Sequence, residues 1–524
     1  MIERVRIIFG CDLRSLAIFR IALALAVFYD VIDRFSYAEL FYSDQGFFDT
    51  EFSKAESPCS FSVNQISGAI LFQQGIFFLL ATSAVCLAIG FYTKIATWVC
   101  WLLVVSIHVR NPFVLIGGDT LIRLMLFWSL FIPLGKIWSI DDWWKQRSGA
   151  ERVRGMDSKT LSTAATACLI FQVCLVYWCA GASKLTETWL DGTAMEYVLR
   201  LEIYVRPFGE WILNFPWLLK AMAYGTLGVE LLVPFLLFLP VWTDRFRILV
   251  ILIFWGLHVG IELALDVGNF GVVSMIIWLP LVPGICWTAF SKKPDPDPRQ
   301  GPESNQPETG SYPEQPVWWR GVISVFVPVF FLIYIVIWNY YGMYILRESK
   351  WRPNLPESFF QLGQVTMVAQ NFQMFGDPPR NNPWFVFNGM LKDGTEIDLL
   401  RDQPARLSRP DKLSKSDVSP QWKKIHRFLL RHDGHHKFHQ ALLVYYSQKW
   451  NKDHSPDQWV MQSHLECYYE PIGPLYRRGD YVRRPDLASW KAPQPKEKTE
   501  IDLIDDVDSF FNGLNRDTVI PLND

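Results

Sequence analysis

Long uncharged stretches separated by charged connections dominate the first 290 residues of this chain, whereas the last 180 residues are mostly polar. A bilayer-spanning helix needs about 20 apolar residues, and nine stretches approach or meet that requirement. The third of them is short, and the seventh carries charged residues. The nine predicted spans are 16–32, 70–92, 95–109, 121–137, 161–181, 222–242, 248–265, 270–289 and 322–338.

The basic residues predict an orientation. Lys and Arg gather in alternate connections, among them Arg4, Arg6, Lys94 and Lys145. Because cytoplasmic loops carry such an excess, we expect the N-terminus in the cytoplasm and, after nine spans, an extracytoplasmic C-terminal region. No small-residue cleavage site follows the first apolar segment, so we expect an uncleaved anchor in a bacterial inner membrane or an ER-type membrane.

Changes in composition divide the chain into five regions. Residues 1–290 are predicted to be a transmembrane domain, 291–321 a Pro- and Gly-rich cytoplasmic linker, and 322–342 the last transmembrane helix. Residues 343–490 are predicted to form an extracytoplasmic β-rich domain, and 491–524 a loosely ordered tail. The expected fold class is an α-helical multi-pass membrane bundle with a small β-rich C-terminal domain.

Three patterns support the β-rich domain. Segments 384–391 and 395–400 flank an Asp-Gly turn and predict a hairpin. Segment 458–469 predicts another strand, and 421–431 predicts a helix.

Composition and motifs argue against several function classes. Hydrophobic residues make up 50% of the chain and aromatic residues 15%, which suits a membrane protein with a soluble part. The net charge of -2 gives no reason to expect a nucleic-acid partner. The sequence contains no phosphate loop, nucleophile elbow or zincin helix, which disfavours ATP-driven transport and hydrolase chemistry.

One tract is rich in histidine, with residues at positions 432, 435, 436 and 439. His435 and His439 have the spacing of two ligands on a helix, but no Cys or acidic residue stands at a confirming distance. We therefore expect a solvated surface segment there and no metal site.

Lys184 directly follows the uncharged stretch of the fifth predicted span. An ammonium at the mouth of an apolar helix is unfavourable unless it is solvated, paired or used. Desolvation favours the neutral amine, which can act as a base near neutral pH. The alternative is a snorkelling lysine that marks the membrane interface.

Polar residues also fall inside the sixth and seventh spans. His258, Glu262 and Asp266 follow each other at intervals of four and share one side of a helix, and Glu230 stands near the middle of the sixth span. Intramembrane ionisable groups usually face a cavity, so we expect these residues and Lys184 to line one polar chamber that opens outward. The alternative is a set of structural hydrogen bonds between helices, with Asp266 solvated.

The junction of the third and fourth spans carries His108, Asn111, Asp119 and Arg123. Two glycines before Asp119 allow a tight turn, and Asp119 and Arg123 are four residues apart, so we expect them to pair on one helix face. A structural re-entry turn is the alternative.

Nine cysteines are present, and only Cys59 and Cys467 fall clearly outside the membrane on the outer side. An oxidising exterior would allow a disulfide between them, which would tie the β-rich domain to the bundle. Two unpaired thiols are the alternative.

Several motifs resemble the HTTM (horizontally transferred transmembrane) domain family, the superfamily of vitamin K-dependent gamma-carboxylase. The resemblance covers most of 12–289, and QNFQMF at 370–375 resembles the start of the extracytoplasmic β domain of such proteins. The matching residues are DLRSLAIFR at 12–20, RNP at 110–112, GGD at 117–119, WSID at 138–141, AGASKL at 180–185, Trp189, Gly192, Met195, Glu196, Tyr197 and His258.

The resemblance implies an enzyme of the gamma-glutamyl carboxylase type with quinone epoxidase activity, a carbon–carbon lyase. It implies reduced vitamin K or a menaquinone-type hydroquinone as cofactor and O2 and CO2 as co-substrates, with no metal. Lys184 would be the base that deprotonates the hydroquinone. His258 would assist catalysis, and the expected quinone- or substrate-binding residues are His108, Asn111, Trp189, Tyr197, Glu230 and Glu262.

The resemblance also implies partners: the bilayer, a lipophilic quinone and a glutamate-bearing protein substrate. The disulfide of the carboxylase, which joins an early loop to the C-terminal part, is similar to the suggested Cys59–Cys467 pair. The chain departs from the animal enzyme in its shorter length and in Ser183, which stands where that enzyme has a second lysine.

Two other function classes stay open. A proton-coupled carrier would use Glu230, His258, Glu262 and Asp266 as a relay. A non-catalytic membrane anchor would display the β-rich domain to a partner, and would tolerate loss of Lys184.

Overall fold

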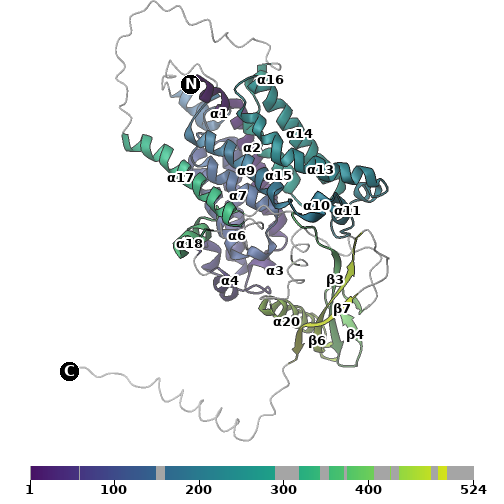
Figure 1. Cartoon of the computed structure of the whole chain (residues 1–524). Coiled ribbons are helices and arrows are strands. Elements are labelled where there is room, and N and C mark those ends of the chain that lie inside the picture. Colours follow the sequence, from purple (N-terminus) through teal and green to yellow (C-terminus); the bar gives the residue numbers. More distant parts are fainter. Residues whose placement is uncertain are drawn as a thin grey trace, which may run out of the picture.

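The computed structural model describes residues 2–57, 60–148, 160–288, 318–342, 353–370, 375–405, 425, 436–473 and 482–492. The helices form a bundle, and a β-sheet with one helix lies at one end of it (Figure 1). The N-terminus and helix α16 (Gly284–Thr288) lie at the opposite end (Figure 1).

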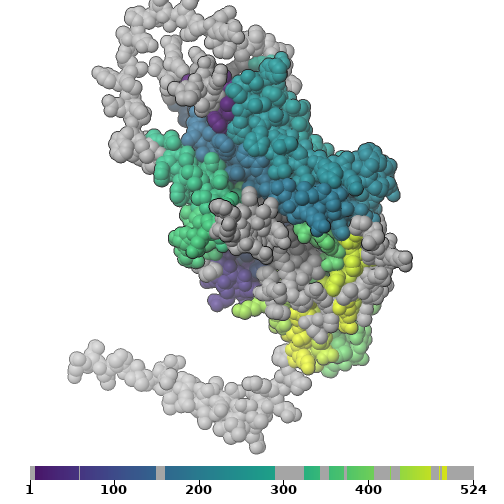
Figure 2. Space-filling view, viewed as in Figure 1, coloured from purple at the N-terminus to yellow at the C-terminus, as the bar shows by residue number. Residues whose placement is uncertain are grey.

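Seven helices within the described residues are long and apolar enough to cross a membrane. The chain is therefore a multi-pass membrane protein. In the space-filling view, α13 and α14 cover one flank of the bundle and α17 lies on the other side (Figure 2). The seven helices are α2 (Leu13–Phe35), α5 (Ile70–Ile89), α6 (Thr93–Arg110), α9 (Ala164–Ser183), α13 (Pro216–Leu232) with its continuation η3 (Val233–Phe238), α14 (Thr243–Ala264) and α17 (Trp318–Gly342).

Local sequence sets the ends of these helices. The Asp12 side chain accepts the backbone N–H of Arg14 at the start of α2, and Thr163 caps α9 in the same way. Gly90 ends α5 in the left-handed conformation, with a φ of 72°. Short elements connect the spans: α1 (Ile2–Phe9), α3 (Ala38–Tyr42), α4 (Thr50–Glu56), η1 (Val63–Gln65), η2 (Pro112–Val114), α8 (Ile140–Arg147), α10 (Glu187–Leu190), α11 (Ala194–Leu199) and α12 (Pro207–Ile212), with strands β1 (Cys11–Asp12) and β2 (Thr160–Leu161) paired.

Two of the nine predicted spans are not among these seven long helices. In the fourth expected span the continuous α-helix is α7 (Gly117–Ser129). After Ser129, the backbone N–H groups of residues 130–132 donate to the carbonyl three residues earlier, and Pro133 follows, so the α-helix ends there. Nearly every residue of α7 is buried within the protein, so this segment lies among other helices of the bundle.

The eighth expected span is likewise broken. It consists of α15 (Phe270–Ile276), η4 (Leu279–Leu281) and α16. Pro280 and Pro283 supply no N–H for a continuous helical ladder, so the segment divides into short pieces.

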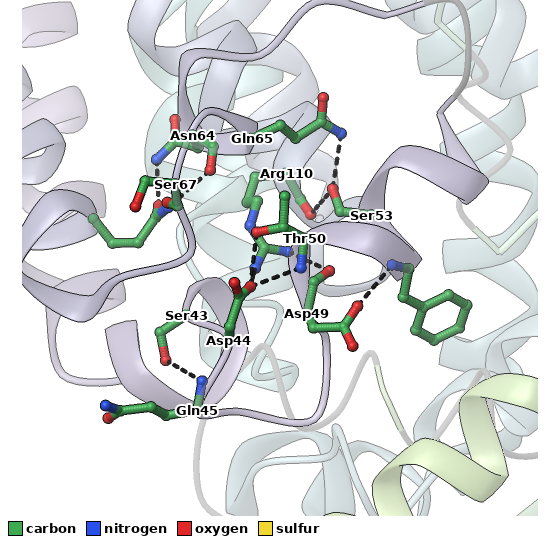
Figure 3. Close-up of polar contacts among 12 residues, drawn as sticks. Ser43, Asp44, Gln45, Asp49, Thr50, Ser53, Asn64, Gln65, Ser67 and Arg110 are labelled. Atoms are coloured by element: carbon green, nitrogen blue, oxygen red, sulfur yellow. Dashed lines mark hydrogen bonds and ion pairs between the residues drawn. The ribbon is translucent and has the colours of Figure 1, made fainter. Parts of the chain in front are cut away.

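The connection between α2 and α5 folds around Arg110, the last residue of α6 (Figure 3). This fully buried guanidinium donates to the carbonyl of Asp49 at 3.1 Å and lies 3.5 Å from the carboxylate of Asp44. Ser53 donates to the Arg110 carbonyl at 2.8 Å. These bonds hold α3 and α4 on the end of α6, so this connection is a structured cap of the bundle.

The C-terminal sheet has five antiparallel strands in the order β5-β4-β3-β6-β7. The predicted hairpin is confirmed as β3 and β4, with Gly394 at a φ of 87° in its turn, and the predicted strand near 458–469 is confirmed as β6. The strands are β3 (Asn381–Leu391), β4 (Glu396–Asp398), β5 (Gln403–Pro404), β6 (Val460–Pro471) and β7 (Val482–Lys491).

Helix α20 (His436–Asp453) was not expected from the sequence, and it packs on the sheet. Its buried residues Leu442 and Leu443 belong to one core with Phe387 of β3 and Leu465 of β6. His439 is also buried, so the expectation of a solvated segment is wrong at this position, because its turn of α20 faces the protein interior.

The C-terminal part is anchored to the bundle at several points. Phe438 of α20 packs on Phe113 of η2, with ring centroids 4.8 Å apart. Helix α18 (Glu357–Thr366) packs on α17, where Tyr334 donates to the Phe359 carbonyl at 2.8 Å. Gln172 of α9 also donates to Gln370 at 2.8 Å, so the sheet end of the bundle is covered by C-terminal residues.

Some predicted features fall outside the described residues: most of the linker 291–321, the helix 421–431 apart from position 425, and the tail beyond 492. No disulfide is seen among the described residues, and Cys59 lies outside them. Cys467 is buried in β6. The predicted pair is therefore not seen here.

Candidate functional site

Lys184 ends α9, and its side chain turns back into the bundle. Its Nζ lies 2.8 and 3.1 Å from the two carboxylate oxygens of Glu230 on α13. Both residues are buried, with 5% and 7% of their surface exposed. Gly181 allows a close approach of α9 and α13, because a Cβ there would stand 2.9 Å from the Leu231 side chain and 3.2 Å from the Cβ of Glu230. Lys184 is thus part of a buried ion pair and does not snorkel to the interface.

A cavity of about 350 Å³ begins at this ion pair. Residues of α9, α10, α11, α13, α14 and α15 line it, and most of them are aliphatic or aromatic. The titratable side chains in its wall are Tyr177, Lys184, Glu230 and His258. Small-molecule sites commonly have this size and this combination of an apolar wall with a few polar groups.

His258 of α14 is the third predicted polar residue in the cavity wall, and it is 2% exposed. Its Nε2 lies 2.9 Å from the hydroxyl of Tyr177, which in turn accepts the indole N–H of Trp278 at 2.9 Å. Because Trp278 can only donate, the single proton of Tyr177 is available for Nε2, and Nδ1 then carries the imidazole proton. Nδ1 is buried and has no hydrogen-bond partner among the described residues. It is therefore a candidate donor for a ligand oxygen.

The cavity reaches the protein surface between α13 and α14. Gly225 and Gly256 line it and are exposed. A Cβ built at either position, or at Gly260, would meet no atom within 4 Å. The neighbouring Leu252 and Val259 are exposed apolar residues of a candidate span, so this side of the cavity faces the direction of the lipid.

Residues from the C-terminal part close the sheet end of the cavity. The Trp189 indole N–H donates to the carbonyl of Phe375 at 2.7 Å, and Phe375 itself lines the cavity. The Nζ of Lys184 lies 5.5 Å from the centre of the Trp189 ring, within the range of a cation–π contact. Gly376 packs so tightly that a Cβ there would stand 2.8 Å from the carbonyl oxygen of Ser183.

Two residues of the predicted polar chamber lie elsewhere. Glu262 and Asp266 are absent from the cavity wall, and their carboxylates lie 3.7 and 3.5 Å from the half-exposed guanidinium of Arg206. Glu262 also accepts the backbone N–H of Gly271 at 3.0 Å. The chamber is therefore a largely apolar cavity with three of the five expected polar residues.

Three other predicted site residues also lie outside the cavity wall. His108 lies 3.0 Å from Nη1 of Arg123, and Asn111 bonds to backbone atoms of the neighbouring turns. Tyr197 packs under the guanidinium of Arg380, 5.6 Å from its ring centre. Their observed contacts are within the protein.

A buried polar cluster lies beside His108. Arg34 bonds to Asp30 at 2.8 Å and to Asp119 at 2.7 Å, so the expectation that Asp119 forms its ion pair with Arg123 is wrong. Ligand atoms of Asp30, His108 and Asp119 lie within 4.8 Å of one another, a spacing that a metal ion can use. Arg34 already bonds to both carboxylates, which favours a structural role. Burial also raises the pKa of Tyr42, which accepts from Arg34, to about 12.

Sequence reasoning missed three residues of the cavity region. Tyr177 and Trp278 orient His258, and Phe375 closes one end. Tyr177 stands seven residues before Lys184, two helical turns away on the same side, and this spacing is a usable signal. Phe375 carries no such signal, because only the tertiary fold brings it to α9.

These features define a multi-pass membrane protein with a buried lysine site beside a lipid-facing cavity. The HTTM domain model matches residues 10–287, slightly more than half of the chain, and the chain belongs to this family. The domain is shared with gamma-carboxylase. Searches against curated proteins and against solved structures found no match.

Proposed function

We propose that this protein is a membrane-bound, quinol-dependent oxygenase of the gamma-carboxylase type, in which Lys184 is the base. Its substrate is a lipophilic hydroquinone of the vitamin K or menaquinone kind. One observation carries the proposal: a buried Lys184–Glu230 pair in the wall of an apolar cavity that reaches the lipid-facing surface.

The ion pair gives Lys184 a route to its neutral form. A buried pair of charges is costly in apolar surroundings, and transfer of one proton from the ammonium to the carboxylate leaves two neutral groups. Glu230 is the acceptor at 2.8 Å. The amine of Lys184 then takes the proton from a bound hydroxyl.

The oxyanion that this proton transfer leaves needs hydrogen-bond donors. Nδ1 of His258, buried and without a partner among the described residues, is one donor, and the re-protonated Lys184 is the other. The chain Trp278–Tyr177–His258 holds the imidazole in the required tautomer. His258 thus stabilises charge, and Lys184 moves the proton.

The cavity residues fit a hydroquinone in shape and polarity. Two donors at one end would hold an aromatic oxygen, the apolar wall would surround the rings, and the glycines of α13 and α14 would leave room for a chain that extends into lipid. The hydroquinone would supply the four electrons that O2 needs, two from its oxidation to the quinone and two from the carbon–carbon double bond that becomes the epoxide. The products would be the quinone epoxide and water, and CO2 would be consumed if a glutamate is carboxylated.

A glutamate-bearing protein substrate would approach from the sheet end. Lys184, Trp189 and Phe375 lie there, where the C-terminal part meets the bundle. In the topology that the basic residues predict, this end is extracytoplasmic.

The carrier alternative has less support. Its relay needs Glu262 and Asp266 beside Glu230 and His258, but both carboxylates face Arg206 instead. No observation favours a mere anchor over an enzyme, since an anchor gives no role to the buried pair and the cavity.

Epoxide formation tests this proposal. Purified protein in detergent is given reduced menaquinone or vitamin K with O2, and Lys184→Ala is compared with Lys220→Ala, which removes an exposed lysine of α13. We expect epoxide from the wild type and from Lys220→Ala, and none above background from Lys184→Ala. Equal epoxide formation by folded Lys184→Ala would show that the base is elsewhere.

A further inference from the structure

A second cavity, of about 370 Å³, lies between the start of α6 and the segment that follows α7. It is at the end of the bundle away from the sheet, because α6 runs from Thr93 at this cavity to Arg110, and the η2 turn after Arg110 packs on α20. Hydroxyls and charged groups contribute much of its wall: Thr93, Lys94, Thr97, Ser129, Lys136, Asp141 and Lys145.

Among the described residues, lysines outnumber carboxylates in the wall of this cavity. Lys94, Lys136 and Lys145 face a single carboxylate, Asp141. The oxygens of Asp141 already accept the backbone N–H and the hydroxyl of Thr93, at 2.8 and 2.6 Å, and one more backbone N–H at 2.8 Å. In the part of the chain that the structure describes, none of the three lysines forms an ion pair.

The lysines also disfavour one another. Partial burial lowers the pKa of Lys136, and the charge of Lys145 lowers it further. An anion bound between Lys136 and Lys145 would offset the repulsion between the two ammonium groups. It would also accept hydrogen bonds that replace those lost from water on burial.

The surroundings place the cavity at the level of lipid headgroups. Tyr92, Trp98, Trp138 and Trp144 are exposed near it, as in the aromatic belts of membrane proteins. The outer face of α6 then continues with exposed apolar residues, including Leu102, along which acyl chains can lie.

We propose that this cavity binds the phosphate group of an anionic phospholipid, with Lys136 and Lys145 as its main ligands and Lys94 at its rim. The hydroxyls of Thr93, Thr97 and Ser129 already donate within the protein, so the ammonium groups supply the hydrogen bonds to the phosphate. This site is distinct from the Lys184 cavity and does not depend on the oxygenase proposal.

Native mass spectrometry of the delipidated full-length protein tests the site. The protein is titrated with phosphatidylglycerol, with phosphatidylcholine and with inorganic phosphate. We expect one phosphatidylglycerol bound in preference to phosphatidylcholine. In Lys136→Ala/Lys145→Ala its affinity should fall roughly 25-fold, since a lysine near an anionic membrane surface contributes about a fivefold factor. Lys136→Arg/Lys145→Arg should retain binding.

The matched control is Lys220→Ala/Lys392→Ala, which removes two exposed lysines outside the cavity and should leave the affinity unchanged. If Lys136→Ala/Lys145→Ala does not fold, Lys145→Glu replaces it, because this side chain is exposed at the cavity mouth. Equal retention of both lipids, or equal loss in the control, overturns the site. Lysine-dependent binding of inorganic phosphate without a preference for phosphatidylglycerol overturns the lipid as its ligand.

Discussion

The Lys184–Glu230 pair makes a quantitative prediction about stability. Both side chains are buried, and Nζ contacts both carboxylate oxygens, at 2.8 and 3.1 Å. Removal of one partner strands the other charge in an apolar wall, which costs about 3–5 kcal/mol in comparable buried pairs. We therefore expect Glu230→Leu and Lys184→Met to be strongly destabilised, and Lys184→Met/Glu230→Leu to be more stable than either, because it strands no charge.

Thermal unfolding in detergent, monitored by intrinsic tryptophan fluorescence, ranks these variants. Arg200→Met is the matched control, because the Arg200–Glu196 pair at 2.9 Å is partly exposed and such pairs contribute about 0–1 kcal/mol. The expected order of midpoints is the wild type and the control, then the double variant, then both single variants. A double variant less stable than each single variant would refute a buried, mutually compensating pair.

Three further predictions follow from the cavity and its surroundings. Gly256→Leu should fill the opening and lower the affinity for a long-chain quinone about tenfold. Gly228→Leu should leave the affinity unchanged, because Gly228 has equally free space around it but lies outside the cavity wall. Quinone titrations by fluorescence quenching compare the two variants, and equal affinities would contradict a lipid-facing opening at Gly256. Trp189→Phe removes the hydrogen bond to the Phe375 carbonyl, which should lower the free energy of unfolding by about 1 kcal/mol. Limited proteolysis near 375–380 should become faster. Cleavage at the wild-type rate would show that this hydrogen bond does not hold the segment on the bundle. Arg34→Met leaves the buried carboxylates of Asp30 and Asp119 without their cation and should lower the yield of folded protein. Arg206→Met, which removes a half-exposed ion pair, should lower the yield far less. Size-exclusion chromatography measures both yields, and similar yields would contradict the buried network.

The sequence was informative wherever the pattern was long and local. Seven of the nine predicted spans, the hairpin at β3 and β4, and strand β6 are present because apolar length and turn chemistry are local properties. The fourth and eighth predicted spans are not continuous long helices, because α7 ends in turns after Ser129 and because Pro280 and Pro283 divide the segment that begins with α15.

The candidate site was predictable only in part. Lys184, Glu230 and His258 stood out because ionisable groups in apolar helices are costly, and the structure brings these three to one cavity. The same reasoning also selected Glu262, which pairs with Arg206 outside the cavity. Arg206 lies on a segment between helices, so the residue spacing along α14 could not predict this partner. Phe375 lies 191 residues after Lys184, and this juxtaposition follows from the docking of the C-terminal part, which local sequence does not encode.

The central claim is that Lys184 starts an oxygenation of a lipophilic hydroquinone. The most direct measurement supplies ¹⁸O2 and reduced menaquinone to the purified protein and determines the isotope content of the quinone product by mass spectrometry. We expect ¹⁸O in the epoxide with the wild type and with Lys220→Ala, and no labelled epoxide with Lys184→Ala. Labelled epoxide from Lys184→Ala at the wild-type rate, or none from folded wild type with either quinone, would contradict it.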